Sequence, residues 1–383
     1  MNRKLVRSIA IATTALLSLG LTTNAQASKK ITLSIAYQGP LTGTDATIGQ
    51  DELGVVKYVV NEFNKTSKKY NIQVVPVDDQ GEANQAATVA PSIAQNKNIV
   101  GLVGPAFSGT TISSLPYYKS FKLPLISPSA TRVSLTDPTS KTDFGGPIFH
   151  RLAAIDSKQG PALLKHAIKG VTKPKVFVFD DQSAYAAPFA QYVVDSMPKL
   201  KVANAGTDSV PADTKDYSAT IAKIKTSGAN VVIYTGYYTA AALFVKQFRA
   251  DSSFKNVIFA GGDGVLNNEF INLAGAAADG ARLTGQATLA DANPKVAAAY
   301  KAAAGKDAGI YAVETYDATS IFLEAIDSGK TTRESILKFI KSKTFKGIGG
   351  TKYAFTANGD IKEGGFTGFL VSSGKLVSKG TIN

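Results

Sequence analysis

Short apolar runs alternate along the chain with segments in which apolar residues recur every three or four positions. The first pattern predicts buried strands and the second predicts amphipathic helices. The predicted strands are 31–36, 72–77, 99–103, 125–126, 176–179, 202–206, 231–234 and 257–260. The predicted helices include 84–95, 110–121, 158–169, 187–197, 218–226 and 240–250, preceded by one that carries Leu53 to Phe63. This alternation is typical of parallel sheets with crossover helices, so the predicted fold class is α/β.

The alternation of predicted strands and helices begins again after Asp156, which indicates two doubly wound, Rossmann-like units. Beyond residue 289 come three helical patterns, 295–304, 313–328 and 333–341, and then a predicted Gly-rich hairpin of 353–356 and 366–371. This tail is long enough to complete either unit. A chain of 383 residues also exceeds the size at which single cores stop growing, roughly 250 to 300 residues, which favours two domains.

The first 27 residues have the order of a secretory signal peptide. Arg3, Lys4 and Arg7 precede an uncharged run from Ile9 to Leu21, and Ala25-Gln26-Ala27 supplies the small residues of a cleavage site. The apolar run is too short for a membrane span, which needs about 20 residues. The sequence therefore predicts export to the periplasm or the medium. A lipid anchor would need a Cys after the cleavage point, and the chain has no Cys, so the product is expected to be soluble and free.

The formal charge of the chain is +13, and the part after residue 27 keeps +10 of it. The lysines fall in loose groups mixed with apolar residues, a pattern typical of a solvated surface. No basic stripe interleaved with aromatic residues is present, so a nucleic-acid partner is not expected.

The sequence contains few of the residue patterns that catalysis needs. It has two His, His150 and His166, and no His pair with the spacing of a zinc site. It has no G-x-S-x-G elbow, no P-loop and no G-x-G-x-x-G. We therefore expect no catalytic residues, no cofactor and no metal. A secreted hydrolase remains a distant alternative, since His150 and His166 are the only histidines that a catalytic triad would have.

Several motifs in fixed order along the chain resemble those of one family. They are Gly39-Pro40-Leu41-Thr42-Gly43, Asp78-Asp79, Val103-Gly104-Pro105-Ala106-Phe107-Ser108, Ile126-Ser127-Pro128-Ser129-Ala130-Thr131, Asp156-Ser157-Lys158-Gln159-Gly160-Pro161, Tyr234-Thr235-Gly236-Tyr237 and Gly261-Gly262-Asp263-Gly264. Over essentially the whole chain beyond residue 27, the sequence resembles the type I periplasmic binding proteins, and among them the Leu/Ile/Val-binding proteins of ABC importers. The family's disulfide within one lobe has no counterpart here.

The resemblance implies two Rossmann-like lobes joined by a three-crossover hinge. Residues 28–154 and 288–354 would form lobe I, and residues 155–287 and 355–383 would form lobe II. The ligand would lie in the cleft between the lobes, which close around it by a hinge motion. No covalent bond changes in such a carrier, which needs no second copy of itself and is expected to be a monomer.

In lobe I the resemblance assigns the grip on the ligand's α-carboxylate to Ser108 and to Ser129, Ala130 and Thr131. Physical chemistry supports the first of these, because Ser108 lies between a strand and a helix, where free backbone N–H groups attract an anion. The alternative is that Ser108 and Ser129 only cap a helix or fill a turn.

In lobe II the resemblance assigns the ligand's α-ammonium to Asp263, where the family usually carries Glu. The alternative is a turn-forming Asp before Gly264. Tyr185 and Tyr237 match aromatic residues of the lobe II cleft, and Tyr311 matches one of lobe I. A further lobe I Tyr of the family is replaced by Ile48, which makes the expected side-chain pocket more aliphatic.

These residues predict an extracytoplasmic binding protein that delivers an amino acid, most simply a branched-chain one, to the permease subunits of an ABC transporter. An alternative with the same fold would bind an amide, urea or an aromatic acid, for uptake or for sensing.

Overall fold

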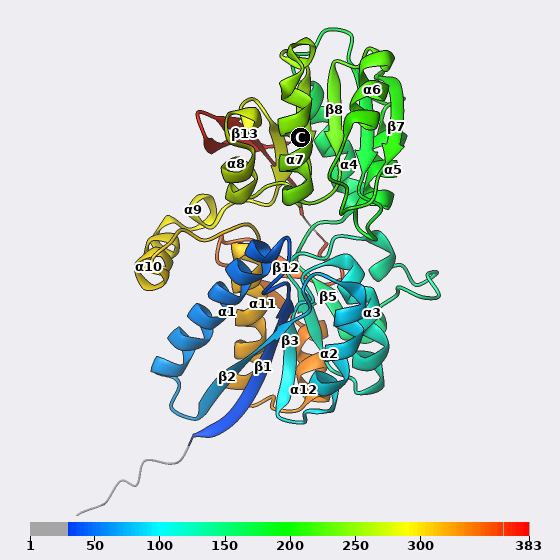
Figure 1. Cartoon of the computed structure of the whole chain (residues 1–383). Helices are drawn as coiled ribbons and strands as arrows, with labels where there is room; N and C mark the ends of the chain where they lie inside the picture. The colour runs from blue at the N-terminus through cyan, green and yellow to red at the C-terminus, as the bar shows by residue number, and fades with distance from the viewer. Residues whose placement is uncertain (1–29, 363, 383) are drawn as a thin grey trace, which may run out of the picture.

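The structure is a computed structural model that describes residues 30–362 and 364–382. The predicted signal peptide, residues 1–27, lies outside the described residues. Each of the two lobes is built around one sheet, and the chain passes between them near the middle of the molecule (Figure 1). The predicted α/β class is confirmed.

The first lobe contains a parallel five-stranded sheet in the order β2-β1-β3-β4-β5. Its strands are β1 (Ile31–Gly39), β2 (Tyr70–Asp78), β3 (Ile99–Val103), β4 (Leu125–Ser127) and β5 (Phe149–Arg151). Its helices are α1 (Ala46–Thr66), α2 (Ala83–Gln95), α3 (Ser108–Ser120), α9 (Leu289–Ala292), α10 (Pro294–Ala304), α11 (Ala312–Asp327) and α12 (Arg333–Ser342). The last four come from far along the chain, yet Val313, Phe322 and Ile340 share one core cluster with Val56 of α1.

The second lobe contains a seven-stranded sheet in the order β14-β13-β10-β9-β8-β6-β7. Its parallel strands are β6 (Lys175–Asp180), β7 (Ala203–Ser209), β8 (Val231–Tyr234), β9 (Ile258–Gly261) and β10 (Arg282–Gly285). Two antiparallel strands, β13 (Thr367–Ser372) and β14 (Lys375–Thr381), extend it past β10. Its helices are α4 (Asp156–Ile168), α5 (Ala186–Ser196), α6 (Ser218–Ser227), α7 (Tyr238–Ala250) and α8 (Asn268–Ala274).

The predicted hairpin of 353–356 with 366–371 is wrong. Residues 352–354 form β12 (Lys352–Ala354), which pairs with β11 (Thr344–Lys346) in a two-stranded sheet. The second half of the proposed hairpin, β13, pairs instead with β10 and β14. The chain between the halves passes from one lobe to the other, and two strands in different lobes have no shared edge on which to form a ladder.

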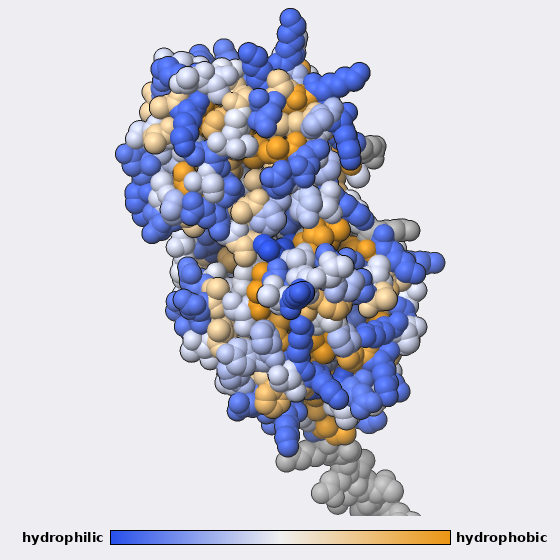
Figure 2. Space-filling model, turned by 90° about the vertical axis from the view of Figure 1, so that its right-hand side faces the viewer, coloured by the Kyte–Doolittle hydropathy of each residue, from blue (hydrophilic) through white to orange (hydrophobic). Residues whose placement is uncertain are grey.

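The chain passes between the sheets three times: between β5 and α4, between β10 and α9, and between β12 and β13. The predicted boundaries at residues 154, 287 and 354 fall within or beside these passages, and their assignment as lobe limits stays a prediction. Seen from the side, the molecule narrows where the passages lie, and apolar side chains gather beside this waist (Figure 2).

Within residues 30–362 and 364–382, no helix has both the length and the apolar character that crossing a membrane requires.

Candidate ligand-binding site

A narrow cavity lies between the lobes, at the carboxyl ends of parallel strands from both sheets. Ligands bind at this edge in open α/β sheets because the loops that follow the strands meet there. The cavity contains about 270 Å³ of space not filled by atoms. It is lined by Ile48, Ala106, Phe107, Ser108, Ser129, Tyr185, Tyr237, Asp263, Gly264 and Tyr311.

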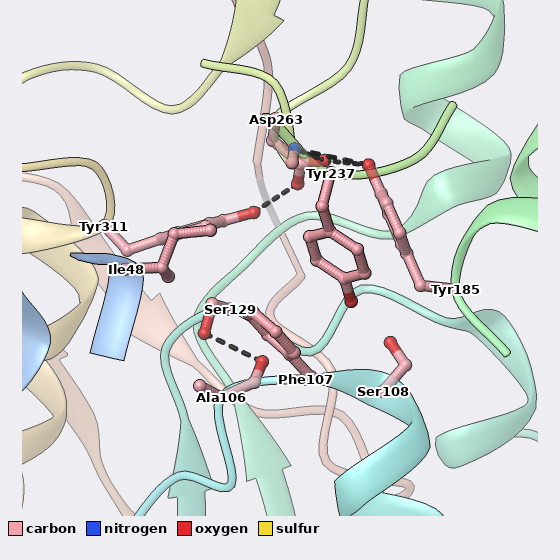
Figure 3. Close-up of a pocket in the computed structure, with 10 residues that line it drawn as sticks. Ile48, Ala106, Phe107, Ser108, Ser129, Tyr185, Tyr237, Asp263 and Tyr311 are labelled. Atoms are coloured by element: carbon pink, nitrogen blue, oxygen red, sulfur yellow. Dashed lines mark hydrogen bonds between the residues drawn. The ribbon is translucent and has the colours of Figure 1, made fainter. Parts of the chain in front are cut away.

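The lobe I side of the cavity presents the first turn of α3 and two serine hydroxyls (Figure 3). Ser108 is the first residue of α3, so its backbone N–H and those of the next two residues have no acceptor within the helix. The Ser108 Oγ accepts a hydrogen bond from the Arg132 N–H at 3.2 Å, and the Ser129 Oγ donates to the Ala106 carbonyl at 2.9 Å. This side therefore offers hydrogen-bond donors and the positive end of a helix dipole.

The lobe II side presents the Asp263 carboxylate, which follows β9 and is 1% exposed. Tyr185 and Tyr311 each donate a hydroxyl hydrogen bond to one of its two oxygens, and the Gly264 N–H donates to Oδ1 at 3.0 Å (Figure 3). Gly262 makes this possible, because a Cβ there would lie 2.4 Å from Phe189 and 3.0 Å from the Tyr185 hydroxyl. The carboxylate is thus fixed in place without a cationic side chain bonded to it.

Tyr311 crosses from the lobe I side to reach Asp263, and its backbone is unusual. It has a φ of 62°, in the left-handed region that bulky residues rarely adopt. Tyr311 is the last residue before α11, so this conformation lies at the junction between the loop and the helix. Backbone strain of this kind persists where the surroundings hold it and is concentrated at functional sites.

Burial dominates the electrostatics of the site. It raises the pKa of the Asp263 carboxyl, although the hydrogen bonds from Tyr185 and Tyr311 lower that pKa in part. Burial, together with the nearby Asp263 charge, raises the pKa of both tyrosine hydroxyls well above its usual value. The tyrosines therefore remain protonated donors.

The side walls of the cavity are apolar and aromatic. Phe107 of the first lobe stacks on Tyr237 of the second with ring centroids 4.4 Å apart, and Tyr237 lies 5.3 Å from the Tyr185 ring. Ile48, at the start of α1, lies between Tyr311 and Ser129 in the close-up (Figure 3). Ile48 and Phe107 belong to a core cluster that otherwise consists mostly of lobe II residues, so the lobes are closed onto each other.

Direct hydrogen bonds also join the lobes around the cavity. The Arg132 guanidinium, held by Ser134 and Asp143 of the first lobe, donates to the Ala184 carbonyl of the second. At the opposite rim, the Thr239 N–H donates to Asp45 at 3.3 Å and the Tyr238 hydroxyl donates to Thr47 at 3.2 Å.

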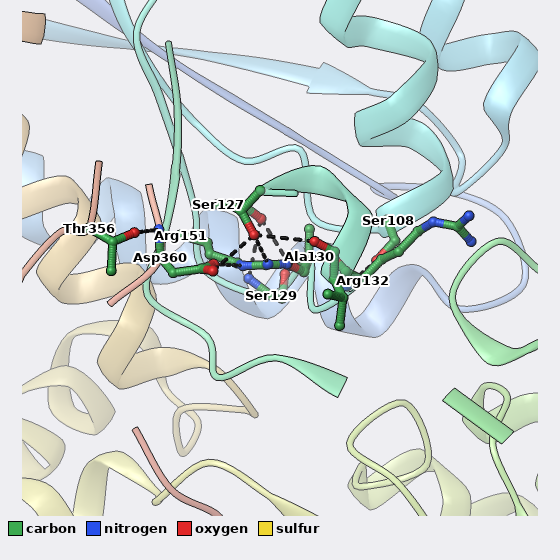
Figure 4. Close-up of polar contacts among 10 residues, drawn as sticks. Ser108, Ser127, Ser129, Ala130, Arg132, Arg151, Thr356 and Asp360 are labelled. Carbon is green, nitrogen blue, oxygen red and sulfur yellow. Dashed lines mark hydrogen bonds and ion pairs between the residues drawn. The ribbon is translucent and has the colours of Figure 1, made fainter. Parts of the chain in front are cut away.

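A buried arginine connects the lobe I loop of the site to the third passage between the lobes (Figure 4). Arg151, which is fully buried, donates to the carbonyls of Ala130 and Arg132 at 3.0 and 2.6 Å and forms an ion pair with Asp360 at 2.7 Å. Arg151 therefore bonds the loop next to Ser129 to the third passage between the lobes.

Of the eight residues predicted for the site, the structure brings six together around the cavity. These are Ser108, Ser129, Tyr185, Tyr237, Asp263 and Tyr311. Ala130 and Thr131 do not line it, and the Ala130 N–H is bonded to the Ser127 Oγ at 3.0 Å. The roles of all eight in binding stay predictions.

Four lining residues, Ile48, Ala106, Phe107 and Gly264, were not among the predicted site residues. Phe107 and Gly264 adjoin predicted residues in the sequence, and Ala106 lies two residues before Ser108, which was the available signal. Ile48 is distant from the others in the sequence, and its only signal is that it stands where the family carries a tyrosine.

A larger groove, with about 1590 Å³ of space, lies beside the second passage and is lined in part by Glu269, Asp291 and Asp307. None of the predicted site residues lines it. Among the described residues, no group of three or more His, Asp and Glu side chains is placed to hold a metal ion.

Comparison with known proteins places these observations in a family. A family model described as periplasmic binding protein matches residues 32–368. The leucine-, isoleucine-, valine-, threonine-, and alanine-binding protein of Pseudomonas aeruginosa is 27% identical over 342 residues, covering 88% of this chain and 89% of its own.

Two solved structures extend the comparison. The branched-chain amino acid transporter substrate binding protein of Streptococcus pneumoniae, solved in complex with isoleucine, is 25% identical with a TM-score of 0.80 and covers 91% of this chain and 99% of its own. A leucine binding protein of Thermotoga maritima shares the fold at 24% identity with a TM-score of 0.81, covering 92% of this chain and 99% of its own.

Proposed function

Since the chain belongs to the periplasmic binding protein family, of the kind found in branched-chain amino acid ABC transporters, we propose that it binds a small aliphatic amino acid between its lobes. Leucine, isoleucine and valine are the leading candidates. The bound form would present the amino acid to the permease subunits of an ABC importer. Residues 1–27 would direct export, and the product would work without a lipid anchor.

The observation that supports this proposal is the opposition of charge across one cavity. The open first turn of α3 and the Ser108 hydroxyl suit a carboxylate, and the Asp263 carboxylate on the other lobe suits an ammonium. An α-amino acid carries both groups on one carbon. Ile48 and Phe107 leave an apolar wall for its side chain.

Binding and closure would be one linked equilibrium. The carboxylate would first occupy the lobe I side, and closure would then add Asp263, Tyr185 and Tyr237 from lobe II. A ligand that contacts both lobes favours the closed form by its additional contacts there.

One observation favours a second candidate, a neutral amide, urea or an aromatic acid. Both Asp263 oxygens already accept tyrosine hydroxyls, so the site has a polar arrangement that does not depend on an ammonium. A hydrolase has less support, because neither His150 nor His166 lines the cavity.

Calorimetric titration of the exported protein tests the proposal. The ligands are the twenty amino acids, urea, short amides and benzoate. We expect binding of leucine, isoleucine or valine and no binding of urea or benzoate. Binding only of ligands without an ammonium would replace the leading proposal by the second one.

A further inference from the structure

Five exposed lysines gather at the end of the second lobe that lies opposite the cavity. They are Lys169, Lys173, Lys175, Lys199 and Lys201. They form two groups in the sequence, and the fold joins the groups because Lys175 begins β6 and is paired with Ala203, the first residue of the neighbouring β7. The Ala203 N–H also donates to the Pro174 carbonyl at 3.1 Å. Hydrophilic side chains project from this end of the lobe (Figure 2).

The charges of these five lysines are not neutralised by acids of the same lobe. Within residues 30–362 and 364–382, none of the five forms an ion pair, whereas Lys223 and Lys225 of α6 do. The acid nearest to Lys199 along the chain, Asp195, accepts a hydrogen bond from Gln191 at 2.7 Å instead. Five like charges held close together create a local positive potential that attracts anions.

Two of the lysines occupy backbone positions that favour another residue. Lys173 has a φ of 49° and Lys201 a φ of 55°, both in the left-handed region and both in turns that lead from a helix to a strand. Glycine adopts this conformation at the least cost. The dipoles of α4 and α5 do not account for these lysines, because that effect is confined to the last turn of a helix and both residues lie beyond it. The turns therefore hold positive charge at a cost in backbone energy.

The character of this surface favours a charged polymer over a lipid bilayer. None of the large apolar side chains that the described residues expose lies in these two turns, so the surface has no apolar anchor to insert between lipids. An ammonium group is a compact charge with three donors and binds phosphate oxygens without a fixed geometry. The turns lie at the amino ends of the strands and the cavity at their carboxyl ends, so a partner bound here leaves the cavity free.

We propose that the five lysines form a contact surface for an anionic polymer that carries many phosphate groups. The inference goes beyond the proposed function and does not depend on it. The polymer contacts the second lobe alone, so it does not discriminate between open and closed arrangements of the lobes. The protein can therefore bind its amino acid equally well when it is held on the polymer.

Calorimetric titration of the exported protein with long-chain inorganic polyphosphate tests the proposal. We expect binding at about 20 mM salt and a loss of at least about 100-fold in affinity at about 200 mM, because each contact between a lysine and a phosphate releases condensed counterions. The variant that combines Lys173→Gln, Lys175→Gln, Lys199→Gln and Lys201→Gln should bind at least about 30-fold more weakly at the lower salt concentration, and its affinity should depend less on salt.

The matched control removes the same net charge from other exposed lysines. It combines Lys57→Gln, Lys141→Gln, Lys246→Gln and Lys295→Gln, on parts of both lobes away from the two turns. We expect this variant to bind polyphosphate within about threefold of the wild type. Both variants change only exposed side chains, and equal melting temperatures would show that both are folded.

Three results overturn the inference. Equal losses in the two variants would assign the attraction to the net charge of the whole chain. Absence of polyphosphate binding by the wild type at about 20 mM salt would remove the surface, as would equal binding of monomeric inorganic phosphate. Binding to phosphatidylglycerol vesicles without binding to polyphosphate would assign the lysines to a membrane. Each of these leaves the proposed function in place, which fails only if the wild type binds no amino acid.

Discussion

The two lobes share one sheet order but offer opposite chemistry to the cavity. Each lobe has five parallel strands. The second of them along the chain lies at one side of the first, and the third, fourth and fifth follow in order on the other side of the first. At the carboxyl ends of these strands, the first lobe presents a helix N-terminus and serine hydroxyls, and the second presents Asp263 and tyrosines. The repeated fold therefore determines where the ligand edge lies, and the loop residues determine which charge each edge attracts.

The lobes also differ in the acids that they bury away from the cavity. In the first lobe, burial raises the pKa of Glu52 and Glu314 to about 8 and that of Asp79 and Asp317 to about 6. The second lobe has Asp156 and Asp181 as buried acids with raised pKa values that do not line the cavity. The stability of the first lobe should therefore depend more strongly on pH.

The largest effect should come from removing the acid on the lobe II edge. Asp263→Ala deletes the carboxylate and leaves the hydroxyls of Tyr185 and Tyr311 without their acceptor. We expect leucine affinity to fall by about 100-fold or more, because a buried charge-assisted contact is lost. Calorimetric titration measures this, and unchanged leucine affinity would show that the ammonium does not lie at this edge.

Glu314→Gln should reduce the pH dependence of the first lobe's free energy of unfolding. The folded pKa of Glu314 is about 8, against 4.5 ordinarily, so its stabilising contribution is complete below pH 4.5 and is lost as the pH rises toward 8. In urea unfolding, the wild type should lose free energy of unfolding between pH 5 and pH 8.5, and the variant should lose less.

Glu334→Gln is the control for this change, because Glu334 lies on the surface of α12 and pairs with Lys338 there. Its pH profile should follow that of the wild type. Parallel profiles for Glu314→Gln and the wild type would contradict the expected role of the buried acid.

Ser108→Ala tests the lobe I edge with a smaller change. It removes one hydroxyl beside the open turn of α3 but leaves the backbone N–H groups in place, so leucine affinity should fall roughly fivefold. Ser120→Ala, at the other end of the same helix, should have no effect on titrations with leucine. Equal affinities for both variants would remove the Ser108 hydroxyl from the carboxylate grip.

Arg132→Gln should have the smallest effect, a weakening of about threefold, because it removes a bond between the lobes and not a contact with the ligand. Faster leucine dissociation in stopped-flow measurements should account for it. Arg282→Gln serves as the control, since Arg282 bonds only to carbonyls of α4 and the residue after it, within the second lobe. Equal dissociation rates in the two variants would rule out a latching role for Arg132.

Much of the fold could be predicted because its parallel strands are continuous apolar runs. The predicted 99–103 and 231–234 coincide with β3 and β8, and the predicted helix 313–328 lies within one residue of α11 at each end. The strands β5 and β10 were not predicted, since their sequences, FHR and RLTG, include polar residues and form no continuous apolar run. The partner of β13 could not be predicted, because strand pairing depends on which lobe the chain has entered.

The candidate site was predictable where a residue lies in or at the end of the loop that follows a parallel strand. Ser108 has this place after β3, and Asp263 has it after β9. It was less predictable inside turns. Thr131 was expected at the ligand, yet it does not line the cavity, and the Ser127 hydroxyl accepts a hydrogen bond from the neighbouring Ala130 N–H.

The return of α11 and α12 to the first lobe has a consequence for synthesis and export. Helix α11 covers α1 and the first sheet, and their side chains form one core cluster, although α1 ends some 245 residues earlier in the chain. A nascent chain that ends before residue 312 has the apolar faces of β1 and α1 but not the helix that buries them. Contacts this distant in sequence form late. The first lobe therefore cannot complete its core until nearly the whole polypeptide has been made, which would suit the export that residues 1–27 are proposed to direct.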